Sequence, residues 1–339
     1  MQRVSGAWDL SAGLEAGGAA RAGTVVPVIG SLLFLVAGFA LLILSADRFV
    51  MAASRVSAAL GLSPILVGAL VIGLGTSAPE MLVSAIAAAQ GEIDLALGNV
   101  VGSNTANLTL VLGSTALVTP IISRLQTIKR EGALMLLSMG AFTLLMWNLD
   151  LNRIKAFGLL LAMIVAALLL IFWSRSDARA GRAPVADPEA VEWQGQVGRE
   201  SLIGIGMLSL VLVGAELLVR GATGLTDDLG ISSAFVGLVI VSVGTSLPEL
   251  ATALAAARRG QTDLVLGNVL GSNLFNTLAV AGIAGLVGPG LADATFHNAL
   301  ILMMGAGVMA GVFSWRSPIQ RWEGSMMLVL FLAFVTVAV

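Results

Sequence analysis

The amino-acid sequence predicts an all-α integral membrane protein with ten transmembrane helices in two inverted five-helix repeats. Three observations carry this prediction: an apolar composition, ten hydrophobic segments of spanning length, and motifs that recur at one fixed offset. Of the 339 residues, 57% are hydrophobic and 11% are charged, against the roughly 25% charged residues of typical soluble domains. So few charges cannot cover a water-soluble surface, which indicates that most of the chain lies in a lipid bilayer.

The composition also excludes several kinds of site and partner. The chain has no cysteine, which excludes disulfides and thiolate metal sites. Its formal net charge of −2 gives no electrostatic basis for binding nucleic acid. Residues 1–26 contain no long apolar core, so we expect a flexible tail rather than a cleaved signal peptide. No cofactor and no obligate protein partner is expected besides the bilayer.

Ten segments reach the length of about 20 mostly apolar residues that a spanning helix needs. Their approximate limits are 27–46, 62–89, 95–119, 132–148, 156–173, 201–219, 231–257, 263–287, 294–314 and 323–339. The polar stretch 174–200 separates the first five from the last five. We therefore expect a tail (1–26), a first five-helix repeat (27–173), a linker (174–200) and a second five-helix repeat (201–339).

The distribution of Lys and Arg predicts the orientation. With the N-terminus outside, the inner loops hold thirteen of the 18 basic residues and the outer segments hold five. Cytoplasmic loops carry such an excess of positive charge. Both termini are therefore expected outside the cell (inner) membrane, and the linker is expected in the cytoplasm.

Two motifs occur twice at the same spacing. Segment 75–80, with the sequence GTSAPE, recurs as GTSLPE at 244–249, and GNVVGSN at 98–104 recurs as GNVLGSN at 267–273. Because each half has an odd number of spans, the second half enters the membrane from the opposite side. Such inverted repeats are typical of secondary transporters, which bind substrate near the bilayer midplane where the repeats meet.

Each copy of the first motif places one carboxylate deep in a predicted span, Glu80 in 62–89 and Glu249 in 231–257. A charge at that depth costs at least ~3 kcal/mol, and no Lys or Arg lies deep in a span to pair with either carboxylate. The two groups would take up protons unless a cation joins them. We therefore predict that a bound cation supplies the counter-charge.

Polar or small residues share one helical face with each glutamate, at spacing i, i+3, i+4 and i+7. The two sets are Gly73, Thr76, Ser77 and Glu80, and Ser242, Thr245, Ser246 and Glu249. Pro79 and Pro248 have no N–H to return to the carbonyls of Gly75 and Gly244. Backbone carbonyls in these turns therefore become available as ligands, in a place where they line a polar cavity.

The second motif adds amides and hydroxyls. Ser103 and Asn107 are four residues apart and share a helical face, and Ser272 and Asn276 repeat this arrangement. The glycine pairs at 98 and 102 and at 267 and 271 are interpreted as packing surfaces that let helices approach closely. For Asn99 and Asn268, holding helices together and touching an ion are equally open roles.

The predicted ligands are all oxygen atoms, from carboxylates, hydroxyls, amides and carbonyls. Hard cations such as Ca²⁺ and Na⁺ prefer oxygen ligands. The only histidine, His297, lies near the outer end of the ninth span. Softer metals such as Zn²⁺ or Cu⁺ are therefore disfavoured.

These motifs resemble the calcium/cation antiporter superfamily, specifically the sodium/calcium exchangers and their prokaryotic relatives. The two motifs look like the alpha repeats of that family, and the resemblance covers nearly the whole chain after residue 30. It implies ten helices and four ion sites clustered between the second, third, seventh and eighth spans. It also implies that Glu80 and Glu249 are the carboxylates shared by Ca²⁺ and Na⁺.

The resemblance also implies roles for the other candidate ligands. Thr76 and Thr245 would contribute mainly backbone carbonyls. Ser77, Ser103, Ser246 and Ser272 would serve Na⁺, and carbonyls of Gly73 and Ser242 would complete the outer Na⁺ sites. Asn107 and Asn276 would face the central position.

The function implied is secondary active exchange of Ca²⁺ for Na⁺ by alternating access, with the first and sixth spans as the moving helices. Proton/calcium exchangers typically show Gly-Asn-x-x-Glu at the glutamate motif, whereas this chain has Thr, Ser and Pro there, which favours Na⁺. Asn276 stands where potassium-dependent relatives have Asp, which weakens the case for a K⁺ requirement. An H⁺/Ca²⁺ exchanger and a transporter of another divalent cation stay open as alternatives.

Two functions of other classes use the same side chains. A cation channel is disfavoured by the inverted repeat and the buried glutamates. An intramembrane enzyme could use two facing carboxylates for acid–base chemistry. The Gly-x-Gly-Asp element expected of intramembrane aspartyl proteases is absent from these spans, so the chain is predicted not to be an enzyme.

Overall fold

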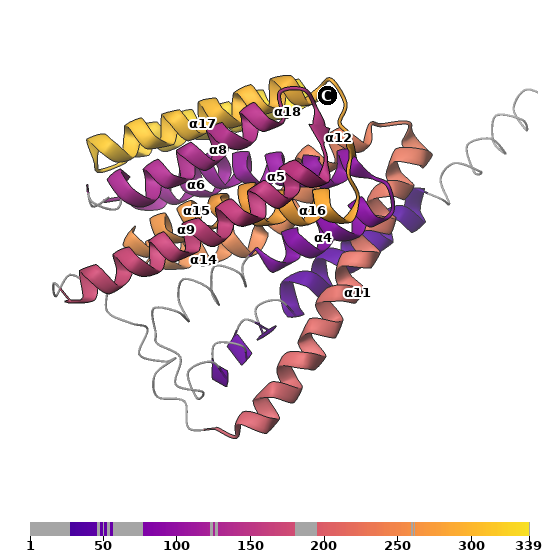
Figure 1. The fold of residues 1–339 in the computed structure, drawn as a ribbon, viewed down its shortest axis with the longest axis horizontal. Coiled ribbons are helices and arrows are strands. Elements are labelled where there is room, and N and C mark those ends of the chain that lie inside the picture. Colours follow the sequence, from indigo (N-terminus) through magenta and orange to yellow (C-terminus); the bar gives the residue numbers. More distant parts are fainter. Residues whose placement is uncertain are drawn as a thin grey trace, which may run out of the picture.

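The computed structural model describes residues 28–45, 48–49, 51–52, 55–56, 77–122, 125, 128–179, 195–258, 260 and 262–338. Nearly all of this described part of the chain is helical (Figure 1). After the helix Val28–Ser45, the first half contains α4 (Ala78–Ala89), α5 (Ile93–Ala106), η2 (Asn107–Val111), α6 (Leu112–Val118), η3 (Ile128–Gly132), α8 (Ala133–Leu145) and α9 (Arg153–Arg179). The elements labelled η are π-helices, whose hydrogen bonds reach five residues along the chain.

The second half has the same kinds of element. They are α11 (Val197–Leu229), α12 (Ser233–Phe235), η4 (Val236–Val241), α13 (Ser242–Thr245), α14 (Leu247–Arg258), α15 (Thr262–Phe275), η5 (Asn276–Val280), α16 (Ala281–Val287), α17 (Phe296–Arg316) and α18 (Arg321–Ala338). Two short strands, β1 (Asp150–Leu151) and β2 (Gly290–Leu291), pair antiparallel, with Asp150 opposite Leu291.

Seven of the described helices are long and apolar enough to cross a membrane. They are Val28–Ser45, Ile93–Val118, Arg153–Trp173, Val197–Leu229, Ser233–Arg258, Val265–Val287 and Phe296–Arg316. The other three expected spans also contain helix: α4 in 62–89, η3 and α8 in 132–148, and α18 in 323–339. Residues 62–76 lie outside the described part of the chain. The protein is thus a multi-pass helical membrane protein, and the count of ten spans stays a prediction.

Two helices extend beyond their expected limits. Helix α9 continues to Arg179, six residues past the predicted end of its span, and α11 runs to Leu229 rather than stopping near residue 219. Hydropathy marks where the apolar stretch ends, but a helix can continue into water because its hydrogen bonds are internal. Gly230, with φ of 65°, ends α11 in the left-handed conformation that suits glycine. Of the expected linker, 180–194 lies outside the described residues.

Loops from the two halves meet at one end of the molecule. Besides the β1–β2 pair, the Asp293 amide donates to Asp94 Oδ1 at 2.9 Å. Ser233 Oγ donates to Glu92 at 3.1 Å. Each of these contacts joins two segments that the sequence places on the outer side.

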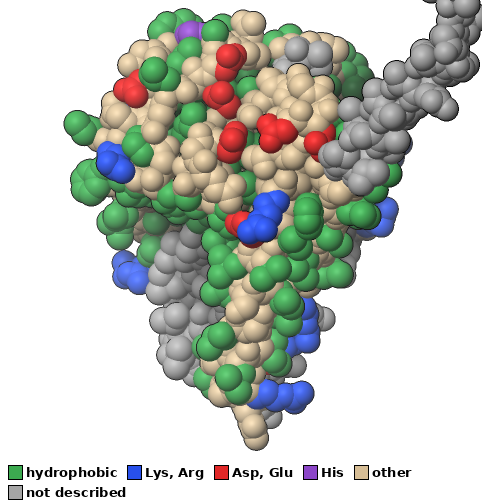
Figure 2. Space-filling view, turned by 90° about the vertical axis from the view of Figure 1, so that its right-hand side faces the viewer, with side chains coloured by type: hydrophobic (Ala, Val, Ile, Leu, Met, Phe, Trp, Pro, Cys, Tyr) green, Lys and Arg blue, Asp and Glu red, His purple; other side chains and the backbone are tan. Residues whose placement is uncertain are grey.

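A second set of contacts joins the opposite ends of the same helices. Ile121 and Ile319 form an isolated β-bridge, and Arg55 pairs with Glu200 at 2.8 Å. The Thr262 hydroxyl donates to the Ile122 carbonyl at 3.1 Å. These segments are the ones that the sequence places on the inner side. Figure 2 shows acidic side chains gathered toward one end of the molecule, whereas Lys and Arg are spread along this face down to the other end.

The helix Val28–Ser45 and α11 cross each other closely, and α11 is steeply inclined to the bundle (Figure 1). A Cβ added to Gly38 would lie 2.7 Å from the Leu218 nitrogen, and one added to Gly221 would lie 2.6 Å from the Leu35 nitrogen. Small residues let membrane helices approach to backbone contact. The two helices therefore pack as a pair.

The glycines of the second motif bring the two halves together. A Cβ on Gly98 would lie 2.7 Å from the Leu238 nitrogen, and one on Gly102 would lie 2.6 Å from Ser242 Cβ. Helix α5 therefore rests directly on η4 and on the first residue of α13. The interpretation of this glycine pair as a packing surface is confirmed. For Gly267 and Gly271, no described atom lies within 4 Å of an added Cβ.

Candidate ion-binding site

A helix begins two residues before each of the repeat-related glutamates, Glu80 and Glu249. Ser246, with φ −84° and ψ 2°, separates α13 from α14, and Ser77, with φ −91° and ψ 7°, precedes α4. Pro248 cannot donate a hydrogen bond to the carbonyl of Gly244, which explains why the helix cannot run straight through. Glu249 and Glu80 are each the third residue of the new helix, in the turn whose N–H groups carry partial positive charge and favour an anion.

The two carboxylates are fully enclosed by protein. Glu80 is 0% and Glu249 is 1% exposed, and none of their carboxylate oxygens has a hydrogen-bond partner among the described residues. They are close enough to interact electrostatically. Two neighbouring like charges without partners are strongly unfavourable in a buried site unless a cation or protons join them.

Further oxygen atoms in the same region lack partners, and they also occur in repeat-related pairs. The hydroxyls of Ser77 and Ser246 are buried without a hydrogen bond in the described structure, as are the amides of Asn107 and Asn276. Native proteins pair nearly all buried polar groups, so an unpaired group calls for a water or an ion. Here three pairs of residues, each related by the internal repeat, are unsatisfied together.

The elements that carry these side chains converge across the repeat. Helix α4, which carries Glu80, packs against η5, and α14, which carries Glu249, packs against η2. Asn107 and Asn276 are the first residues of η2 and η5, respectively. Single π-helical turns inside α-helices are frequent at functional sites. The packing places one glutamate-bearing helix of each half against the asparagine-bearing turn of the other.

Ser103, Ser242 and Thr245 are buried but already hydrogen-bonded. Ser103 Oγ lies 3.5 Å from the Thr245 hydroxyl and 3.5 Å from the Ser242 carbonyl. That carbonyl also accepts from the Ser246 amide at 3.1 Å. Ser272 is 1% exposed. Gly73 and Thr76, the remaining predicted ligands, lie outside the described residues.

Asn99 connects three helices at the edge of this site. Its amide nitrogen donates to Ser84 Oγ at 2.9 Å and to the backbone carbonyl of Glu80 at 3.3 Å. Its Oδ1 accepts from Thr245 at 3.0 Å and from Ser103 at 3.3 Å. Of the two roles that the sequence leaves open for Asn99, this geometry favours the structural one, because the residue holds Glu80 and Thr245 in place.

Replacing Asn99 by Ala is expected to lower Ca²⁺ transport at least about tenfold, since each buried polar group left without a partner costs about 1–3 kcal/mol. Ser84→Ala removes only one of the four hydrogen bonds and should cost much less. Initial rates of Ca²⁺ uptake at equal amounts of reconstituted protein would measure both. An Asn99→Ala rate within twofold of wild type would contradict the positioning role.

Two further oxygen atoms were not among the predicted ligands. Asn104 and Asn273 donate to the carbonyls of Val100 and Val269, at 3.1 and 2.7 Å, and their buried Oδ1 atoms have no partner in the part of the chain that the structure describes. They are repeat-related and belong to the Gly-Ser-Asn motif. The duplication itself is the signal that could have added them to the candidate set.

The arrangement suits a hard cation better than a transition metal. No group of three or more His, Asp or Glu side chains with metal-binding spacing occurs in the part of the chain that the structure describes. The available ligands are two carboxylates together with hydroxyl, amide and carbonyl oxygens. Such all-oxygen sets bind Na⁺ and Ca²⁺, and Ca²⁺ accepts six to eight of them in flexible geometry.

Comparison with known proteins agrees with this chemistry. The family model described as sodium/calcium exchanger protein matches residues 30–172 and 201–339. The putative antiporter CaxA of Alkalimonas amylolytica is 37% identical over 313 residues, which cover 89% of this chain and 96% of CaxA. The sodium/calcium exchanger MaX1 of Methanosarcina acetivorans is 29% identical over 340 residues, which cover 90% of this chain and 97% of MaX1.

Solved structures of sodium/calcium exchangers are also similar to this chain. A structure of the sodium-calcium exchanger NCX_Mj soaked with Na⁺ and Sr²⁺ is 31% identical, with a TM-score of 0.64, and the match covers 91% of this chain and 98% of NCX_Mj. The resemblance to the calcium/cation antiporter superfamily is confirmed, and the family and fold are those of membrane transporters rather than enzymes. The chain belongs to the sodium/calcium exchanger protein family.

Proposed function

We propose that this protein exchanges Ca²⁺ for Na⁺ across the cell membrane by alternating access. The observation that supports this most directly is the set of buried oxygen atoms on Glu80, Glu249, Ser77, Ser246, Asn107 and Asn276 that have no hydrogen-bond partner among the described residues. These groups are enclosed, repeat-related and acidic in sum, so they need positive charge to be stable. Of the relatives, MaX1 and NCX_Mj are named sodium/calcium exchangers.

The two glutamates explain why transport would be coupled. One Ca²⁺ neutralises both carboxylates, and Na⁺ ions at overlapping positions do the same. Ser77, Ser103, Ser246 and Ser272 supply hydroxyls for Na⁺, while Asn107 and Asn276 face the central position. An empty site leaves two charges in a medium of low dielectric constant, which penalises any crossing without cargo. The protein would then exchange Ca²⁺ for Na⁺ instead of letting either ion cross independently.

Alternating access requires one part of the protein to move across the site. The helix Val28–Ser45 and α11 are suited to this because their close glycine crossing makes them one rigid pair. The ring of Phe39 fills the space beside Gly244, where a Cβ would lie 2.6 Å from Phe39 Cδ1. Movement of the pair along the bundle would shift this ring over the Gly-Thr-Ser turn and open one side of the site or the other.

The coupling ion is testable by reconstitution. Ca²⁺ uptake into Na⁺-loaded proteoliposomes diluted into Na⁺-free buffer should be fast and should vanish without internal Na⁺. An outward H⁺ gradient without Na⁺ should drive none. Uptake driven only by the H⁺ gradient would instead assign the protein to the H⁺/Ca²⁺ exchangers, and transport of Mn²⁺ or Mg²⁺ in place of Ca²⁺ would change the substrate.

The proposed topology has ten spans, with both termini outside and the Arg-rich linker in the cytoplasm. Because the chain has no cysteine, single cysteines can report which side is exposed. In intact cells, a membrane-impermeant thiol reagent should label Asp227→Cys at one end of the molecule and leave Gln320→Cys at the other end unlabelled. Labelling of Gln320→Cys alone would show that the protein has the opposite orientation in the membrane.

A further inference from the structure

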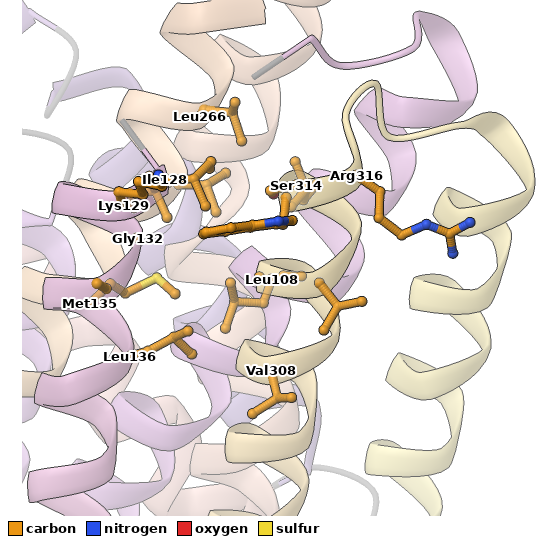
Figure 3. A pocket seen from close by; sticks show the side chains of 18 residues that line it. Leu108, Ile128, Lys129, Gly132, Met135, Leu136, Leu266, Val308, Ser314 and Arg316 are labelled. Atoms are coloured by element: carbon orange, nitrogen blue, oxygen red, sulfur yellow. The ribbon is translucent and has the colours of Figure 1, made fainter. Parts of the chain in front are cut away.

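An apolar cavity of about 440 Å³ lies apart from the glutamates, between η2, α6, α8, α15 and α17 (Figure 3). The part of the cavity deepest in the protein is lined by Leu108 and Leu112, which are 0% and 1% exposed. Val308 and Val312 line it from α17 and are 53% and 50% exposed. Because the exposed surface of these helices faces lipid, the cavity leads from the bilayer into the protein.

The cavity has a basic end and an apolar end. In Figure 3, Lys129 and Arg316 lie toward one end with Ile128, while Leu136 and Val308 lie toward the other. No Asp or Glu belongs to the described lining. Arg316 extends away from the cavity in Figure 3, so its guanidinium marks the rim rather than the interior.

The basic end is at the depth expected of lipid headgroups. Lys129 Nζ lies 5.5 Å from the ring centroid of Trp315, which lines the cavity and is 57% exposed. Trp residues concentrate at the membrane–water interface. The neighbouring Arg130 lies 5.9 Å from the ring of Trp173. Two Trp residues paired with basic side chains therefore mark the interface beside the cavity.

We propose that this cavity binds an anionic phospholipid, with one acyl chain inside and the phosphate near Lys129. A membrane-open apolar cavity of this size gains contacts when a chain fills it. Basic pockets between transmembrane helices bind anionic headgroups. The occupant would touch Leu108, which directly follows Asn107 in η2, so it would support the segment that carries an ion-site amide. The proposal does not depend on the identity of the transported ions.

Native mass spectrometry of the full-length protein in nanodiscs of mixed phosphatidylglycerol and phosphatidylcholine would test the site. The wild type should retain phosphatidylglycerol in preference to phosphatidylcholine. Lys129→Gln should weaken that preference about fivefold. The Lys129 side chain is exposed, so this variant should fold. Arg175→Gln, which removes an exposed basic residue outside the cavity, should keep the preference.

A second variant tests the acyl chain. A Cβ on Gly132 would meet only Ile128, at 3.7 Å, so Gly132→Leu should fill the cavity and displace the retained lipid. Gly158→Leu, on the open face of α9, is the matched control and should retain it. Equal retention of both lipids by the wild type, unchanged retention in Gly132→Leu, or co-purification of free fatty acid alone would each overturn the proposal.

Discussion

Replacing either Glu80 or Glu249 by Gln is expected to reduce Na⁺-driven Ca²⁺ uptake at least about 100-fold. Glutamine has nearly the same shape but removes one of the two charges that neutralise Ca²⁺. Removing one partner of a buried charge interaction costs about 3–5 kcal/mol, and each 1.4 kcal/mol is tenfold in binding. Initial uptake rates at equal protein content, with folding checked by size-exclusion chromatography, would measure the effect.

The matched control is another glutamate of the same protein. Glu216 pairs with Arg220 at 2.7 Å on an exposed surface, where an ion pair contributes about 1 kcal/mol or less. Glu216→Gln should therefore transport at close to the wild-type rate. Normal exchange in Glu80→Gln or Glu249→Gln would show that the ion site lies elsewhere.

Adding a single methyl group at Gly102 is expected to lose most of the folded protein and its transport. The Cβ of Gly102→Ala would lie 2.6 Å from Ser242 Cβ and closer still to the Leu238 carbonyl oxygen. Backbone atoms cannot yield unless α5 separates from η4, and overpacking of this kind costs typically 1–3 kcal/mol. The separation would also move Ser103 away from Thr245. Thermal unfolding in detergent and Ca²⁺ uptake would measure the two effects.

Gly158→Ala separates this clash from the general effect of Ala in a helix. Gly158 lies in α9 with no atom within 4 Å of an added Cβ, and Ala favours helix over Gly by about 1 kcal/mol. Gly158→Ala should therefore keep or raise the unfolding temperature. A Gly102→Ala protein as stable and active as Gly158→Ala would contradict the close contact between the two halves.

Much of the architecture could be predicted because duplication leaves a direct record in the sequence. The fixed offset between Glu80 and Glu249 indicates two equivalent halves, and an odd number of predicted spans in each half predicts that they are inverted. The contacts of Asp94 with Asp293 and of Ile121 with Ile319 agree with the predicted sides, since each joins loops expected on one side. Charge and hydropathy, averaged over long stretches of sequence, predict which loops lie on the same side of the membrane.

Local backbone geometry at the site could not be predicted in the same way. Proline explains a break near Gly244, but the turn residue is Ser246. The π-helices that begin at Asn107 and Asn276 differ from α-helix by one residue per hydrogen bond, which no sequence pattern specifies. The role of Asn99 depends on Thr245, which is 146 residues away and meets it only after folding.

Equilibrium binding of ⁴⁵Ca²⁺ to the purified protein, titrated with Na⁺, tests most directly whether one carboxylate pair serves both ions. We expect Na⁺ to displace Ca²⁺ competitively in the wild type, and we expect Glu249→Gln to bind no measurable Ca²⁺ while Glu216→Gln binds it normally. Ca²⁺ binding that is indifferent to Na⁺, or that persists in Glu249→Gln, would contradict a shared site at Glu80 and Glu249.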